Sequence, residues 1–189
     1  MRRIRINSKN LTMPSVIGSL AALLLLLTLV GCFQSDHPLL NIFNSVTPVA
    51  EGRYNYEELS DKSKKSLTIT HDGTVTKMIS TKADGSVQIS KLYMHELGDN
   101  FYIVMDPSND YSLIHVNSKA VLEFDETYCD DLLDLARSTG KSISEYGVAK
   151  VVGEKSHSCQ FTDLDDLKNA MVALINNDKI VVARIYKPQ

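Results

Sequence analysis

The cysteines are the residues whose type and spacing point most directly to chemistry. Cys32 ends an apolar run at residues 16–30, and the residues before it include basic but no acidic side chains. The other two, Cys129 and Cys159, lie 30 positions apart. The chain has no Cys-x-x-Cys pair, and His157 is the one candidate metal ligand close to Cys159, so neither a redox centre nor a metal centre is predicted here.

The residues around Cys32 resemble the lipobox of bacterial lipoproteins. Leu29-Val30-Gly31-Cys32 stands where the apolar run stops, after a basic segment at residues 2–9, and this order is typical of a signal peptide. The resemblance implies cleavage before Cys32 and acylation of its thiol and its new amino group. Several acyl chains would give a stable anchor, since burial of each CH₂ contributes about 0.8 kcal/mol.

Two other interpretations of this region stay open. The first is a transmembrane anchor that is never removed, although the dense apolar part at residues 21–30 is shorter than the roughly 20 residues that a spanning helix needs. The second is a twin-arginine signal at Arg2-Arg3, which lacks the usual preceding polar residue.

The residue after the lipobox bears on location. It is Phe33 rather than Asp, which in the enterobacterial lipoproteins that the segment resembles favours the outer membrane. The expected location is therefore the cell membrane or the outer membrane, with the domain facing the periplasm or the cell exterior.

The remaining cysteines are expected to form a disulfide. The location that the resemblance implies is oxidising, and an even pair of cysteines in such a compartment is typical of a disulfide. Closing the loop from Cys129 to Cys159 is expected to stabilise the fold by roughly 3–4 kcal/mol in the chain-entropy model. The alternative is two buried thiols.

Composition limits the domains and the partners. Without the signal peptide at residues 1–31, the chain has 158 residues, of which 16 are basic and 23 acidic, with a net charge of −7. This charge argues against a nucleic-acid partner and against attraction to anionic headgroups, so the lipid at Cys32 is the predicted membrane contact. Residues 32–50 are predicted to form a tether that reaches roughly 50 Å when extended. Residues 51–189 form a single domain.

The tether and the domain have distinct patterns. The polar residues 33–38 are expected to be mobile, and apolar residues at helical spacing in 39–46 predict a short docked helix. From residue 51 to 125, alternating segments and tight turns such as Asp72-Gly73 and Asp84-Gly85 predict an antiparallel meander. A hairpin at residues 148–161 and a last strand at 180–186 follow.

Helical patterns lie near the C-terminus. Residues 132–136 share one apolar stripe that ends before Gly140, and a second helix at 164–175 can be capped by Thr162 or Asp163. The predicted fold class is therefore α+β: an antiparallel sheet of about seven strands packed with C-terminal helices. A curl of this sheet towards a barrel stays open.

Two acidic segments resemble metal sites superficially. Residues 106–112 place oxygen ligands at alternate positions, but Tyr111 and Asn117 occupy the places where a calcium loop has Gly and Glu, so a turn is predicted. A second group of acids surrounds Cys129, and a solvated face is favoured over a site for a cation or a basic partner. Its members are Glu123, Asp125, Glu126, Asp130, Asp131 and Asp134.

The remaining chemical groups do not indicate an enzyme. The histidines His71, His95, His115 and His157 are scattered, with His95 and His115 on predicted strands, and no Gly-x-Ser-x-Gly motif is present. No catalytic residue, cofactor or metal is predicted. Five tyrosines on or beside strands suit a recognition surface, although ordinary half-buried strand positions are favoured. These are Tyr54, Tyr56, Tyr93, Tyr102 and Tyr111.

A second resemblance concerns the order of elements. A meander, a helix and a final strand are similar to lipocalin-like barrels, with Gly52-Arg53-Tyr54 where that family carries Gly-x-Trp. The main expectation is a non-catalytic, membrane-anchored lipoprotein that binds a protein or another envelope component. The alternatives are a lipocalin-like binder of a small apolar ligand, whose binding residues the sequence does not identify, and an uncharacterised envelope enzyme.

Overall fold

The computed structural model describes residues 32–82, 84–125, 128–153 and 157–189. The predicted signal peptide at residues 1–31, with the Arg2-Arg3 pair and the first three residues of the lipobox, lies outside the described residues. Within them the chain forms eleven strands, two α-helices and one 3-10 helix. The predicted class α+β is confirmed, but the sheet has eleven strands rather than about seven.

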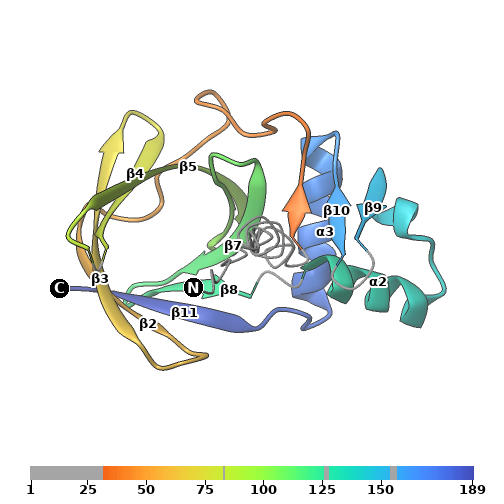
Figure 1. Ribbon diagram of the computed structural model, residues 1–189. Coiled ribbons are helices and arrows are strands. Elements are labelled where there is room, and N and C mark those ends of the chain that lie inside the picture. The colour runs from red at the N-terminus through yellow and green to blue at the C-terminus, as the bar shows by residue number, and fades with distance from the viewer. Residues whose placement is uncertain (1–31, 83, 126–127, 154–156) are drawn as a thin grey trace, which may run out of the picture.

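Eight of the strands close into an antiparallel barrel (Figure 1). They are β2 (Gly52–Glu58), β3 (Lys64–Asp72), β4 (Val75–Thr81), β5 (Val87–Gly98), β6 (Phe101–Met105), β7 (Asp110–Val116), β8 (Val121–Phe124) and β11 (Val182–Pro188). Each strand from β2 to β8 pairs with the next, and β11 then joins β8 to β2. The predicted meander is thus the barrel wall, and the last strand closes it.

The meander turns follow the local signals that predicted them. Gly73 and Gly85 have φ values of +61° and +83°, a region that side-chain-bearing residues rarely adopt. These two glycines allow the tight connections from β3 to β4 and from β4 to β5.

Three short strands extend the sheet beyond β7. They are β1 (Phe33–Gln34), β9 (Lys150–Val152) and β10 (Ser158–Gln160). β1 runs antiparallel to β7 and parallel to β10, and the Phe33 ring lies 4.8 Å from that of Phe161 and 5.6 Å from that of Tyr128. Phe33 is fully buried, so the prediction of a mobile start to the tether was wrong at this point. Burial of one aromatic ring outweighs the polar character of the residues that follow it.

Residues 35–50, here called the strap, cross the outside of the barrel. The predicted helix at 39–46 is absent and only a turn at 42–44 is present. Backbone groups of the strap bond sideways instead: Val46 N–H donates to Met94 O at 2.8 Å, and Asn44 O lies 2.7 Å from His95 Nδ1. These contacts use backbone groups that a helix would need for itself.

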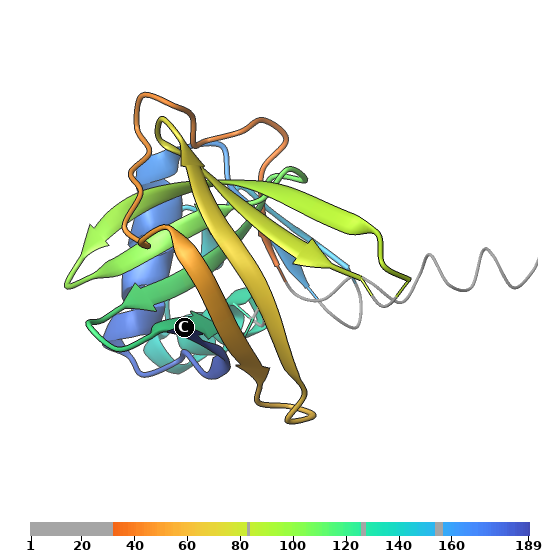
Figure 2. The same ribbon diagram turned by 90° about the vertical axis from the view of Figure 1, so that its left-hand side faces the viewer.

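The two ends of the barrel differ. The β3–β4, β5–β6 and β7–β8 turns lie at one end, which the strap reaches before β2 begins; we call it the strap end (Figure 2). The β2–β3, β4–β5 and β6–β7 turns lie at the other end, which we call the mouth end.

Helices cover one side of the barrel, on the right in Figure 1. They are α2 (Tyr128–Thr139), the 3-10 helix η1 (Ile143–Tyr146) and α3 (Leu164–Asn176). Asp163 caps α3 by accepting from the backbone N–H groups of Asp165 and Asp166. The predicted disulfide between Cys129 and Cys159 is confirmed and joins the start of α2 to β10.

The strands β6 and β7 are buried on both faces. Val104 and Ile114 point into the barrel, whereas Ile103 and Leu113 pack in the cluster that contains the helices. Side chains of a strand alternate between its faces, so the two strands serve two separate cores.

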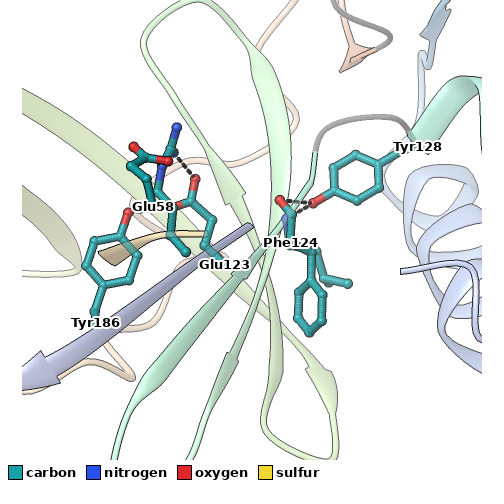
Figure 3. A network of polar contacts seen from close by, with 7 residues as sticks. Glu58, Glu123, Phe124, Tyr128 and Tyr186 are labelled. Carbon is teal, nitrogen blue, oxygen red and sulfur yellow. Dashed lines mark hydrogen bonds and ion pairs between the residues drawn. The ribbon is translucent and has the colours of Figure 1, made fainter. Parts of the chain in front are cut away.

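A tyrosine hydroxyl spans a gap along one edge of β7. This edge pairs with β8 from Ile114 onwards and with β1 up to Tyr111. Between these segments, Leu113 N–H donates to Tyr128 Oη at 3.0 Å, and Tyr128 Oη donates to Phe124 O at 3.2 Å (Figure 3). The side chain thus replaces a missing strand partner.

The burial of Phe33 leads to a stability prediction. We expect Phe33→Ala to lower the free energy of unfolding by about 3–5 kcal/mol, because a buried aromatic side chain is lost. Urea unfolding of the full chain in mild detergent would measure this. The matched control is Phe43→Ala in the strap, because Phe43 is 92% exposed and should change stability by no more than about 0.5 kcal/mol. Equal losses in both variants would contradict the docking of β1.

Candidate functional site

The barrel encloses a cavity of about 230 Å³. Most of its lining comes from alternate residues of the barrel strands, as expected for side chains that point inward. The lining residues are Val49, Ile69, Thr76, Met78, Ser90, Leu92, Met94, Val104, Asp106, Pro107, Ser112, Ile114, Val121, Glu123 and Tyr186. Apolar side chains dominate this wall, while Asp106 and Glu123 are its two charged members.

The strap closes the cavity at the strap end. Val49 is 3% exposed and lines both the cavity and a second hollow beside the β7–β8 turn. Its carbonyl oxygen is 2.8 Å from His71 Nε2, and Tyr54 Oη donates to Ala50 O at 2.9 Å. These bonds hold Val49 and Ala50 across the strap end. The cavity therefore extends towards the mouth end, where Pro107 completes its lining.

A network of charged side chains lies beside the cavity near the mouth end (Figure 3). Arg184 Nε donates to Glu58 Oε1 and Arg184 Nη1 donates to Glu123 Oε1, each at 2.7 Å. Tyr186 Oη donates to the second oxygen of Glu123. Three strands, β2, β8 and β11, therefore hold one another through their inward side chains.

The surroundings keep Tyr186 and Arg184 protonated. Burial raises the pKa of Tyr186, and the Glu123 carboxylate raises it further, so the phenol stays protonated and donates. Burial would lower the pKa of Arg184, but Glu123 and Glu58 outweigh this and the pKa is raised. Each Glu123 oxygen accepts one hydrogen bond, and these two bonds orient the carboxylate. Each oxygen keeps a second lone pair, which can accept a further hydrogen bond from a ligand.

The sequence interpretation missed this network. Glu123 was assigned to a solvated acidic face, but its side chain is only 14% exposed and points into the barrel. Glu58 and Arg184 were not singled out at all. The available signal was their alternation with Tyr56 and Tyr186, which places charges on the side of each strand that also carries aromatic rings.

The other predicted acidic residues separate in space. Asp130 lies 2.5 Å from His157, and Asp134 pairs with Arg137 at the surface. Asp125 and Asp131 are described, whereas Glu126 lies outside the described residues. Within the described ranges, no group of three or more His, Cys, Asp or Glu side chains is arranged to hold a metal ion.

The turn predicted within residues 106–112 is confirmed at residues 106–109, and Asp110 already begins β7. Asp106 Oδ1 accepts from the backbone N–H groups of Ser108 and Asp110 at 2.7 and 3.0 Å. Asn109, with a φ of +62°, completes the reversal. Asp106, one of the residues that suggested a calcium loop, thus uses its carboxylate within the turn, whereas the Asp110 carboxyl bonds the Gln34 side chain.

The five tyrosines do not form one exposed patch. Tyr54, Tyr56 and Tyr102 belong to the cluster inside the barrel, Tyr111 is 1% exposed, and Tyr93 packs against the helix-covered core. Tyr111 Oη bonds the strap at Ser35 Oγ and Leu39 N–H. The interpretation as buried strand positions is therefore confirmed.

The histidines are also used separately. His71 and His95 bond backbone oxygens of the strap, and His115 packs on Phe101 with ring centres 4.7 Å apart. Strand register places His95 and His115 on the same outer face of the barrel, two strands apart. No two of the four histidines meet in the cavity.

Cys32, the expected lipid-attachment residue, sits directly on the domain. It is buried, and its carbonyl oxygen accepts from Cys159 N–H at 3.0 Å. None of the helices in the described residues is both long enough and apolar enough to cross a bilayer. A scan against models of protein families, a search of curated proteins and a search of solved structures each find no match to this chain.

The charged network leads to a mutational prediction. We expect Arg184→Met to lower the free energy of unfolding by about 1–3 kcal/mol, because two half-buried carboxylates lose their shared partner. Chemical unfolding measures the change. Arg137→Met is the matched control, since Arg137 is 71% exposed in its pair with Asp134 and should cost no more than about 0.5 kcal/mol. Similar losses in the two variants would show that the network contributes nothing.

The raised pKa of Tyr186 predicts a pH dependence. A phenol whose folded pKa lies above its ordinary value of about 10 contributes stability that is complete below pH 10 and is lost as the pH rises further. We therefore expect the free energy of unfolding to fall between pH 8 and pH 11, and to fall less in Tyr186→Phe. Urea unfolding at both pH values tests this. An equally large fall in the free energy of unfolding in Tyr186→Phe would refute it.

Proposed function

We propose that the protein is a lipid-anchored, non-catalytic binder of a small and largely apolar ligand, which it holds inside the barrel. The observation that supports this proposal is the cavity of about 230 Å³ within a closed antiparallel barrel. Concave, mostly apolar sites with a few fixed polar groups are typical of small-molecule binding. The fold is compatible with a lipocalin-like binder.

An internal ligand is favoured over a protein partner bound through tyrosines. That alternative needs an exposed tyrosine-rich patch, whereas Tyr54, Tyr56 and Tyr102 turn into the barrel. The apolar surface that the sheet offers is therefore concave and internal.

The size of the cavity limits the ligand. Its volume lies just below the roughly 300–1,000 Å³ that is usual for drug-sized ligands. At roughly 30 Å³ for each water-sized group, it accommodates about eight such groups. This size fits a short aliphatic chain or one end of a longer chain.

The charges of the cavity favour a particular polar end. Both charged residues of the lining, Asp106 and Glu123, are acidic. A carboxylate ligand would face these like charges, whereas a hydroxyl group can donate to Glu123. A neutral alcohol is therefore preferred to an acid of the same length.

The envelope role follows from the lipobox resemblance. In this proposal, acylated Cys32 holds the domain at the cell membrane or outer membrane, facing the periplasm or the cell exterior. Because Phe33 is already part of the sheet, the lipid would be attached next to the folded domain rather than at the end of a long tether. An envelope protein as a further partner stays a proposal.

Binding of a series of linear alcohols tests the proposed ligand class. We expect affinity to rise about fourfold for each added methylene, since burial of CH₂ contributes about 0.8 kcal/mol, and to level off near eight carbons. Bound alcohol should raise the melting temperature, and the acid of equal length should bind more weakly. Isothermal calorimetry and thermal unfolding are the measurements.

Filling the cavity provides the control. Val104→Phe replaces a small side chain of the lining with an aromatic ring and should reduce affinity by more than tenfold. Val181→Phe, at a 66% exposed position, should not reduce it. The proposal fails if no alcohol stabilises the native chain, or if Val104→Phe binds as tightly as the native chain.

A further inference from the structure

The outer face of the β4–β5 hairpin carries an exposed apolar strip. Val87 and Ile89 are 63% and 59% exposed, and they lie two residues apart on one face of β5. Ile79 stands opposite Ile89 in the register, so it belongs to the same face. The hairpin extends away from the rest of the barrel, to the right in Figure 2.

Lysines flank this strip in a chain that is otherwise acidic. Lys77 and Lys91 are paired across the two strands beside Ile79 and Ile89, and Lys82 lies at the start of the turn. Lys77 Nζ forms an ion pair with Asp72 Oδ2 at 2.8 Å. Lys82 and Lys91 form no ion pair with any described residue. Asp72 also lies within electrostatic reach of Lys91, and Asp84 lies in the turn, so three lysines stand against two acids along this strip. Exposed aliphatic side chains edged by a net positive charge are complementary to the interface of an anionic bilayer.

The expected lipid anchor lies nearer to the mouth end of the barrel than to the strap end. The β4–β5 turn belongs to the mouth end, and Ser35 N–H donates to Asn109 O in the β6–β7 turn of that end. Cys32 is three residues before Ser35, which in extended chain is roughly 10 Å. Because β1 runs antiparallel to β7, this step back from Ser35 leads away from the β6–β7 turn and places Cys32 at the level of Ser112. An acyl group on Cys32 would therefore tether the half of the barrel that adjoins the mouth end.

We propose that the outer face of the β4–β5 hairpin rests on the surface of a bilayer that contains anionic lipids. Val87 and Ile89 enter the interface, and Lys82 and Lys91 contact the headgroups. The β4–β5 side of the barrel then lies against the membrane near the mouth end, while Phe43, next to the β3–β4 turn at the strap end, stays in water. The docking does not depend on whether the cavity is occupied.

Tryptophan fluorescence tests the docking, because the chain contains no tryptophan. The full chain with Ile89→Trp is reconstituted in vesicles of phosphatidylglycerol and phosphatidylethanolamine with brominated acyl chains. We expect its emission to shift to shorter wavelength and to lose most of its intensity through quenching by bromine. Phe43→Trp, at a position that is 92% exposed, is the matched control and should show neither change.

Charge reversal separates the lysines from the apolar strip. Adding Lys82→Glu and Lys91→Glu to the Ile89→Trp chain should weaken quenching in brominated anionic vesicles. It should not weaken quenching in vesicles made of brominated phosphatidylcholine alone. Equal quenching with and without these lysines overturns the charge part of the proposal. An Ile89→Trp emission that is no more quenched than that of Phe43→Trp overturns the docking. A shift without quenching means that a second copy covers the hairpin, which also overturns it.

Discussion

Burial of β7 on both faces is the constraint on which the rest of the molecule depends. Ile114 faces the barrel cavity and Leu113 faces the helices, so the register of this strand is fixed from two sides. A slip of one residue would exchange the two sets of side chains and disrupt both cores. The same strand also changes partner along one edge, from β8 to β1, and the Tyr128 hydroxyl satisfies the backbone between them. The barrel, the helices and the N-terminal strand are thereby joined in one structure.

The charged network gives the barrel interior a polar side that is already fixed before any ligand enters. Arg184 is held between Glu58 and Glu123, and Tyr186 takes the remaining oxygen of Glu123. Removing such charges from water is costly, so a network of this kind is weak as a source of stability but strong in setting geometry. Apolar side chains can pack against groups of different shape, whereas the hydrogen-bonding positions of the charged network are fixed. In the proposed ligand-binding role, this fixed side would set the selectivity.

Local signals predicted the parts of the fold that depend on neighbouring residues. Asp163 and the apolar stripe after it give α3 its start, and Gly73 and Gly85 give the turns. The candidate site was not predictable in this way, because Arg184 meets Glu58 across 126 positions and Glu123 across 61. Closure of β11 on β2 has the same long-range character. A charged residue in a strand is predicted to be exposed to solvent unless the partner strand that supplies its counter-charge is known.

The position of Phe33 has a mechanical consequence. A force applied at Cys32 acts on β1, which lies between β7 and β10 with its backbone bonds arranged across the direction of pull. The load then passes into the barrel through β7 and, through Cys159 and its covalent partner Cys129, into α2. Tension applied at Cys32 is thus shared between a hydrogen-bonded strand and a covalent bond, and the cavity wall does not carry it alone.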